Sequence, residues 1–124
     1  MRPANRGFEI SAGDQLRFNR WIARVSHRWG MAVALKNDPG QVRQLVGNFD
    51  FAVVESCFDY DECGRFLPFI RRGKAVFLAE YEMRPDEFCE RAIDLRFSAI
   101  RKSYDLFARP WEPCVSAAAS AGRG

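Results

Sequence analysis

The chain has 124 residues, 48% of them hydrophobic and 14% aromatic, and its 19 basic and 16 acidic side chains give a net charge of +3 at pH 7. This length supports a single hydrophobic core, and so much aromatic area excludes a disordered chain. No apolar run approaches the about 20 residues of a membrane-spanning helix, and the first residues lack the apolar segment of a signal peptide. We therefore expect a folded chain without a membrane partner.

The first predicted element is a long helix that follows Ser11. Ser11 and Asp14 have the spacing of a capping box, and apolar side chains recur behind them at helical spacing. We expect this apolar stripe, which includes Phe18, Trp21 and Trp29, to be buried. Four arginines on the other face have the spacing of a solvated helix surface, so no nucleic-acid partner is expected.

Four short apolar segments, none with strict polar alternation, are predicted to be strands: residues 31–36, 51–55, 75–80 and 97–102. Strands of this kind are buried on both faces, as in parallel sheets, and parallel strands need crossover helices between them.

Helix starts are predicted between these strands. Asp38 and Pro39 suit the first turn of one helix, Asp59 or Asp61 can cap the next, and Pro85 with two acidic residues opens the last. The predicted order is one helix followed by repeated strand and helix pairs.

Each predicted strand ends at a charged residue, namely Lys36, Glu55, Glu80 or Lys102, at separations of 19, 25 and 22 residues. This period predicts an α/β fold of four consecutive βα units from a (β/α)8 TIM barrel. A flavodoxin-like sheet is disfavoured because no phosphate-cradling glycine-rich turn follows a strand.

The chain is too short to close such a barrel, which takes about 250 residues. We expect residues 1–114 to form the carboxyl-terminal half of the barrel and residues 115–124, rich in Ala, Ser and Gly, to form a disordered tail. Four strands leave two open edges, so a missing amino-terminal half or a second copy is the expected partner.

The strand-end carboxylates are the leading catalytic candidates. Charged side chains at the carboxyl ends of barrel strands point into the mouth where active sites form, and glycoside hydrolysis uses two carboxyl groups. Glu55 and Glu80 fit that chemistry, and Tyr60 and Tyr81 follow them as sugar-binding candidates. Pairing of either Glu with Lys36 or Lys102 is the alternative.

The cysteines, at positions 57, 63, 89 and 114, lack the spacing of a zinc site, and no metal is expected. We favour disulfides between Cys57 and Cys63 and between Cys89 and Cys114. Reduced, buried thiols remain an alternative.

Several blocks of the sequence are distinctive when read together. They are DQLRFNRWIA at 14–23, LKND at 35–38, FDFAVVESCFDYDEC at 49–63, PFIRRGKAVFLAEY at 68–81 and FSAIRKSYDL at 97–106. In order and spacing they resemble the carboxyl-terminal half of the endo-alpha-1,4-polygalactosaminidase family, the TIM-barrel glycoside hydrolases of family 114.

The resemblance implies an extracellular or cell-surface hydrolase that cuts galactosamine-rich polysaccharide without a cofactor. Glu55 matches one of the two proposed catalytic carboxylates of the family. The L-K-N-D block places Lys36, Asn37 and Asp38 at the mouth, and the E-Y pair places Glu80 and Tyr81 there. We add Lys102, which ends the last predicted strand, to these substrate-binding candidates.

Two departures from the family pattern matter. The second proposed carboxylate is an Asp on the preceding strand, in a motif near which only Arg2, Pro3, Ala4 and Asn5 stand here. We therefore expect little activity from this chain alone, and a non-catalytic carbohydrate-binding or self-associating half-barrel is the alternative. The other departure is Arg96, where relatives carry a helix-ending Gly. It matters because an Arg in the left-handed conformation of a helix cap costs more free energy than a Gly.

Overall fold

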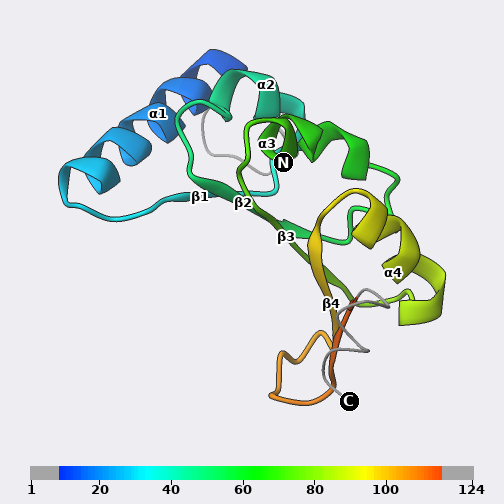
Figure 1. The fold of residues 1–124 in the computed structure, drawn as a ribbon. Coiled ribbons are helices and arrows are strands. Elements are labelled where there is room, and N and C mark those ends of the chain that lie inside the picture. Colours follow the sequence, from blue (N-terminus) through cyan, green and yellow to red (C-terminus); the bar gives the residue numbers. More distant parts are fainter. Residues whose placement is uncertain (1–8, 116–124) are drawn as a thin grey trace.

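The computed structural model describes residues 9–115, which form one five-stranded sheet with helices packed on one face (Figure 1). The strands are β1 (Ala34–Lys36), β2 (Phe51–Glu55), β3 (Val76–Glu80), β4 (Ser98–Lys102) and β5 (Trp111–Pro113). The α-helices are α1 (Ala12–Arg28), α2 (Val42–Leu45), α3 (Leu67–Arg71) and α4 (Pro85–Asp94), and the 3-10 helices η2 (Pro39–Gln41) and η3 (Cys63–Phe66) precede α2 and α3. None of these helices is both long and apolar enough to cross a bilayer.

The first four strands lie side by side in chain order and are all parallel. This order confirms the predicted succession of βα units. The sequence did not predict β5, which runs antiparallel to β4 with Lys102 opposite Trp111. This strand was not predicted because the segment contains prolines at 110 and 113, and a strand that contains Pro is restricted to a sheet edge. The expectation that two parallel strands are left at open edges was therefore only half correct: within the described chain β5 covers the outer edge of β4, and β1 is the one parallel strand at an edge.

The predicted helix starts are only partly confirmed. The side chain of Ser11 accepts the N–H of Asp14 at 3.0 Å, as the capping box requires, and α4 begins at Pro85. Pro39 opens η2, but the side chain of Asp38 makes no capping bond. Neither Asp59 nor Asp61 caps a helix, because a turn occupies this stretch and η3 begins only at Cys63.

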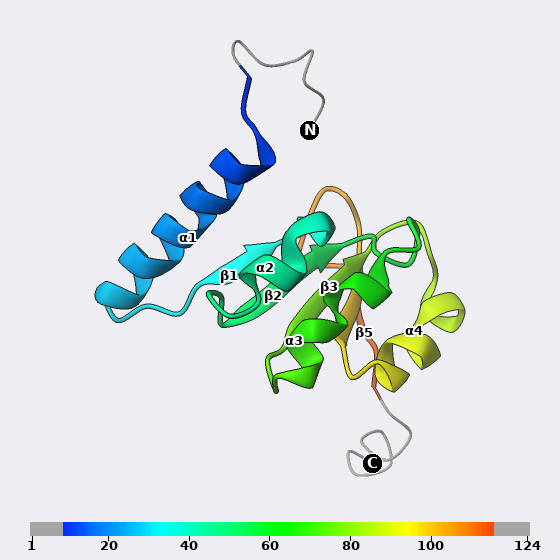
Figure 2. The same ribbon diagram turned by 90° about the horizontal axis from the view of Figure 1, so that it is seen from above.

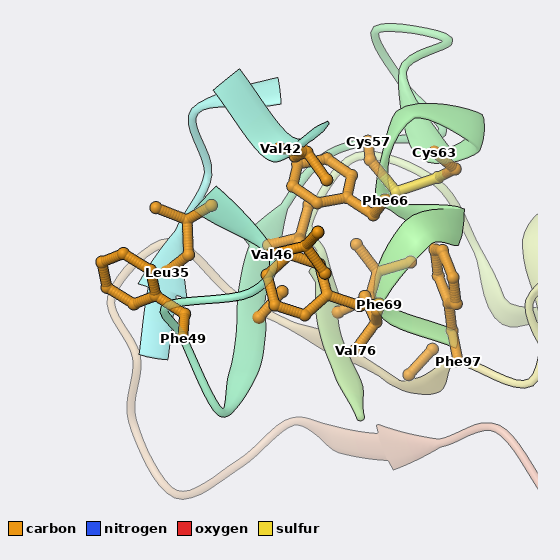
Figure 3. Packing of buried hydrophobic residues seen from close by; sticks show 14 of the residues in the cluster. Leu35, Val42, Val46, Phe49, Cys57, Cys63, Phe66, Phe69, Val76 and Phe97 are labelled. Atoms are coloured by element: carbon orange, nitrogen blue, oxygen red, sulfur yellow. A yellow bond between two sulfur atoms is a disulfide. The ribbon is translucent and has the colours of Figure 1, made fainter. Parts of the chain in front are cut away.

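The core lies between the sheet and the helices that cover it (Figure 3). Ala52 and Val54 of β2 and Val76 and Leu78 of β3 are buried on this face, where they pack with aromatic residues of the helical layer. The other face of the sheet stays partly open to solvent, and Phe77 on it is 46% exposed. One face of the sheet is thus covered by helices and packed into the core, whereas the other face has no such cover among the described residues.

Helix α1 lies at the β1 end of the sheet, where it contacts the helical layer beside α2 (Figure 2). The prediction that its aromatic stripe is buried was wrong, because Phe18, Trp21 and Trp29 are 55%, 53% and 77% exposed. Only Ala23 of this helix is buried. The described chain offers α1 a narrow contact, chiefly the short helix α2, which cannot cover a wide apolar face.

Both favoured disulfides are present, Cys57–Cys63 in the segment after β2 and Cys89–Cys114 between α4 and the segment after β5. Residues 116–124 of the tail predicted at 115–124, and the stretch from Arg2 to Asn5, lie outside the described residues.

Arg96 has the left-handed backbone that its departure from the family pattern implied, with φ of 64°. It follows the end of α4 in a Schellman arrangement, in which the N–H of Phe97 reaches the carbonyl of Ala92 at 2.9 Å. Because a Cβ costs about 1 kcal/mol in this conformation and the side chain is exposed, we expect Arg96→Gly to raise the free energy of unfolding by roughly 0.5–1 kcal/mol. Urea denaturation checks this, and an Arg96→Ala variant, which keeps the Cβ, should show no such gain.

Candidate functional site

A depression of about 430 Å³ opens at the carboxyl end of β2, and we call it the Glu55 depression. Its lining comes from the segments after β1, β2, β3 and β4, as expected for a barrel mouth. The lining residues are Asn37, Pro39, Val54, Glu55, Ser56, Tyr60, Glu62, Phe66, Tyr81, Tyr104 and Leu106. Two of them are acidic and none of the described lining residues is basic.

Glu55 is held from both sides in this depression. Its backbone N–H donates to Asn37 Oδ1 at 2.9 Å, and the Tyr81 hydroxyl donates to Glu55 Oε1 at 2.8 Å. Glu55 pairs with Ala79 of β3, so Tyr81 lies two residues further along on the same face of the sheet. The register of β2 against β3 therefore brings this carboxylate and this phenol together.

Tyr81 remains protonated well beyond neutral pH. Burial, together with the hydrogen bond to Glu55, raises the pKa of Tyr81 to about 12. Its ring stacks on that of Tyr104 with centroids 4.7 Å apart and an angle of 15° between the ring planes. Tyr104 hydrogen-bonds Glu82, which raises the pKa of Tyr104 to about 12 as well. Both phenols are consequently hydrogen-bond donors under all ordinary conditions.

The coupling of Tyr81 to Glu55 gives a direct prediction. We expect Glu55→Gln to lower the pKa of Tyr81 from about 12 toward 10.0, because the substitution removes the negative charge that disfavours the phenolate. NMR titration of tyrosine ring carbons measures this value, and Tyr104 serves as the internal reference. An unchanged Tyr81 titration would contradict the contact.

Glu80 does not lie with Glu55, contrary to the expectation that both line the mouth. It follows Leu78 on the helix-covered face and is fully buried, with Oε2 accepting the N–H of Phe58 at 2.8 Å. Side chains of a strand alternate between faces, and the stagger of β2 against β3 puts Tyr81 on the open side in place of Glu80. Burial raises the pKa of Glu80.

The remaining predicted residues divide between two places. Asn37, Tyr60 and Tyr81 line the Glu55 depression, whereas Lys36 and Asp38 line a second one of about 450 Å³ between β1 and α1. Burial raises the pKa of Asp38, whose Oδ2 is buried without a partner among the described residues. Lys102 lines neither depression, and its Nζ donates to the carbonyl of Phe107.

The sequence reasoning missed three polar residues of the depression, Ser56, Glu62 and Tyr104. All three belong to the distinctive blocks, but none ends a strand, and charge at a strand end was the main criterion. A search for aromatic residues within a few positions of each strand end would have found Tyr104.

The comparisons with known proteins identify the family. The sequence profile described as "Glycoside-hydrolase family GH114" matches residues 2–119. The chain belongs to this family. The resemblance to the endo-alpha-1,4-polygalactosaminidase family is thereby confirmed, and the comparison with curated proteins gives no match.

A solved structure supports the same assignment for this family 114 chain. Ega3 of Aspergillus fumigatus, determined in complex with galactosamine, superposes with a TM-score of 0.74 at 25% sequence identity. The match covers 82% of this chain and 46% of that one, so the family 114 chain spans about half the length of the solved relative. This coverage confirms the predicted fold class, a run of βα units from a TIM barrel.

Proposed function

We propose that this chain supplies the carboxyl-terminal half of the active site of a glycoside hydrolase that acts on galactosamine-rich polysaccharide. The observation that carries the proposal is the Glu55 depression, where a carboxylate held by Tyr81 stands among further tyrosines and no described basic residue. A protonated amino sugar suits such a lining, because carboxylates attract its ammonium group and aromatic faces add cation–π attraction.

In this proposal Glu55 exchanges a proton with the glycosidic oxygen. Glycoside hydrolysis requires a second carboxyl group on the other side of the scissile bond. We assign that group to the amino-terminal half of the barrel, so this chain alone binds sugar and hydrolyses little or none. Asn37, Tyr60 and Tyr81 hold the sugar, and Lys36, Asp38 and Lys102 act further along the polymer. The two disulfides favour an oxidising compartment, which agrees with action outside the cell.

Sugar titrations followed by NMR test the binding part of the proposal. We expect galactosamine to shift the amide signals of Glu55, Tyr60 and Tyr81, and neutral galactose and N-acetylgalactosamine to bind at least about 10-fold more weakly. Added salt should weaken the binding of galactosamine and leave the binding of the two neutral sugars unchanged, because only the ammonium group is attracted electrostatically. Equal affinity for the three sugars, or shifts confined to other surfaces, would refute the proposal.

A second candidate function is a non-catalytic, self-associating half-barrel. The open edge of β1 and the exposed aromatic side chains of α1 favour it, because unpaired strand edges and apolar stripes promote association. The described sheet ends at β1 on one side and at the antiparallel β5 on the other, so β1 is the parallel edge strand that a second copy can pair with. Sedimentation velocity distinguishes the candidates: a tight dimer whose assembly Trp21→Glu abolishes supports self-association, and a monomer that binds galactosamine excludes it.

A further inference from the structure

Glu80 is the one charged residue within 9–115 that is fully buried. Its carboxyl group lies beneath the turn that joins β2 to η3, residues 56–62, and one of its oxygens is within 4.8 Å of the sulfur atoms of Cys57 and Cys63. Those sulfurs are joined in a disulfide, so this cluster offers no thiolate for a metal. The carboxyl group has no part in the hydrolysis proposed above, and its burial calls for a structural partner.

That partner is the backbone of the 56–62 turn. Glu80 Oε2 accepts the N–H of Phe58 at 2.8 Å. At the start of the turn the N–H of Ser56 continues the sheet and donates to the carbonyl of Ala79 in β3 at 2.9 Å. Beyond that point the backbone bonds are internal: the N–H of Tyr60 reaches the carbonyl of Ser56 at 3.1 Å and the N–H of Glu62 that of Cys57 at 2.7 Å. Glu80 therefore adds a tie to β3 in the middle of the turn, at Phe58.

The turn carries two residues of the Glu55 depression, Tyr60 and Glu62. Its position on the sheet decides where both side chains stand relative to Glu55. The ring of Phe58 packs against Phe88 of α4 at 6.1 Å and lies 4.7 Å from the guanidinium carbon of Arg91. The ring and the amide of Phe58 are thus held by two different elements, α4 and β3.

We infer that Glu80 is a positioning residue, whose carboxyl group anchors the 56–62 turn to β3 and so sets the places of Tyr60 and Glu62 beside Glu55. The anchoring stands by itself, and its consequence for sugar binding rests on the proposed function. The electrostatics agree with a structural carboxyl group: burial raises the pKa of Glu80, the bond from Phe58 opposes this, Asp59 raises it and Arg91 lowers it.

Amide hydrogen exchange tests the anchor directly. In Glu80→Leu the Phe58 amide loses its acceptor, and we expect it to exchange about 10-fold or more faster than in the wild type. Glu80→Gln keeps an acceptor oxygen in the same place and should preserve slow exchange. Leu78→Ala, on the same face of β3, is the control for a weakened core, since it should not accelerate Phe58 selectively. Equal exchange of Phe58 in wild type and Glu80→Leu would overturn the inference.

A second measurement covers the case in which Glu80→Leu does not fold. In the wild type the Phe58 amide proton should shift as the pH is raised from about 3 through the titration of Glu80, whose pKa burial raises, because its acceptor ionises. The same signal should stay constant in Glu80→Gln, and a wild-type signal that ignores pH would overturn the anchor. Galactosamine affinity should fall in Glu80→Leu and recover in Glu80→Gln. If no sugar binds the wild type, the proposed function fails while the exchange data still decide the anchor.

Discussion

Replacing Glu55 by Gln is expected to lower hydrolysis of a galactosamine polymer by about 10²–10⁴-fold, the usual contribution of a proton-transferring group. The assay combines this chain with an amino-terminal half of a family 114 barrel, since both carboxyl groups must flank one glycosidic bond. Gln keeps the size of Glu55 and an oxygen that accepts from Tyr81, but it cannot exchange the proton. The measured quantity is the rate of new reducing ends per complex.

The control for this prediction is Glu90→Gln on the exposed surface of α4, which removes the same charge far from the depression. It should leave the rate unchanged. Measuring galactosamine affinity distinguishes a role of Glu55 in sugar binding from a role in proton transfer. A variant that loses turnover but still binds galactosamine indicates proton transfer. Full activity of the Glu55→Gln complex would contradict the proposed role.

Replacing Phe69 by Ala is expected to lower the free energy of unfolding by about 3–5 kcal/mol, the largest stability effect that we predict for one substitution. Phe69 of α3 has no solvent exposure and packs against the sheet beside Phe66 and Val76 (Figure 3). Its loss leaves a cavity that the surrounding strands cannot fill. Such a loss is a large share of the stability of a domain of this size. Urea unfolding monitored by circular dichroism gives the value.

Phe77→Ala is the matched control, because it removes the same side chain from the open face of the sheet. Phe77 is 46% exposed and contacts Phe51 edge to face at 5.6 Å. We expect a loss of less than about 2 kcal/mol, since much of this ring is already in water. Equal losses in the two variants would mean that the open face carries as much of the core as the helix-covered face.

The two faces of the sheet explain why stability and activity are expected to separate in this chain. The helix-covered face holds the buried core and both disulfides tie segments near it. The proposed chemistry belongs to the rim and the open face, where Glu55 and Tyr81 meet. In that proposal the half-barrel keeps its folded core and depends on another half for catalysis.

The sequence by itself determined the family, three of the strands and the favoured cysteine pairs, whereas it began the first strand three residues before Ala34 and missed β5. The predicted strands coincide with β2, and with β3 and β4 to within one residue, because each apolar run stops at a charge. The same strand-end charge made Glu55 the leading catalytic candidate, and the structure places it in the depression. The left-handed conformation at Arg96 was implied by the resemblance, because relatives carry a helix-ending Gly there.

The tertiary structure alone decided which side each strand-end residue faces. The apolar strands show no polar alternation, so their sequences carry no information about orientation, and a shift of one residue moves a side chain to the other face. The stagger of β2 against β3 therefore placed Tyr81 beside Glu55 and buried Glu80 under the 56–62 turn. The exposure of α1 and the pairing of β5 were likewise decided by contacts between distant segments, which local patterns do not encode.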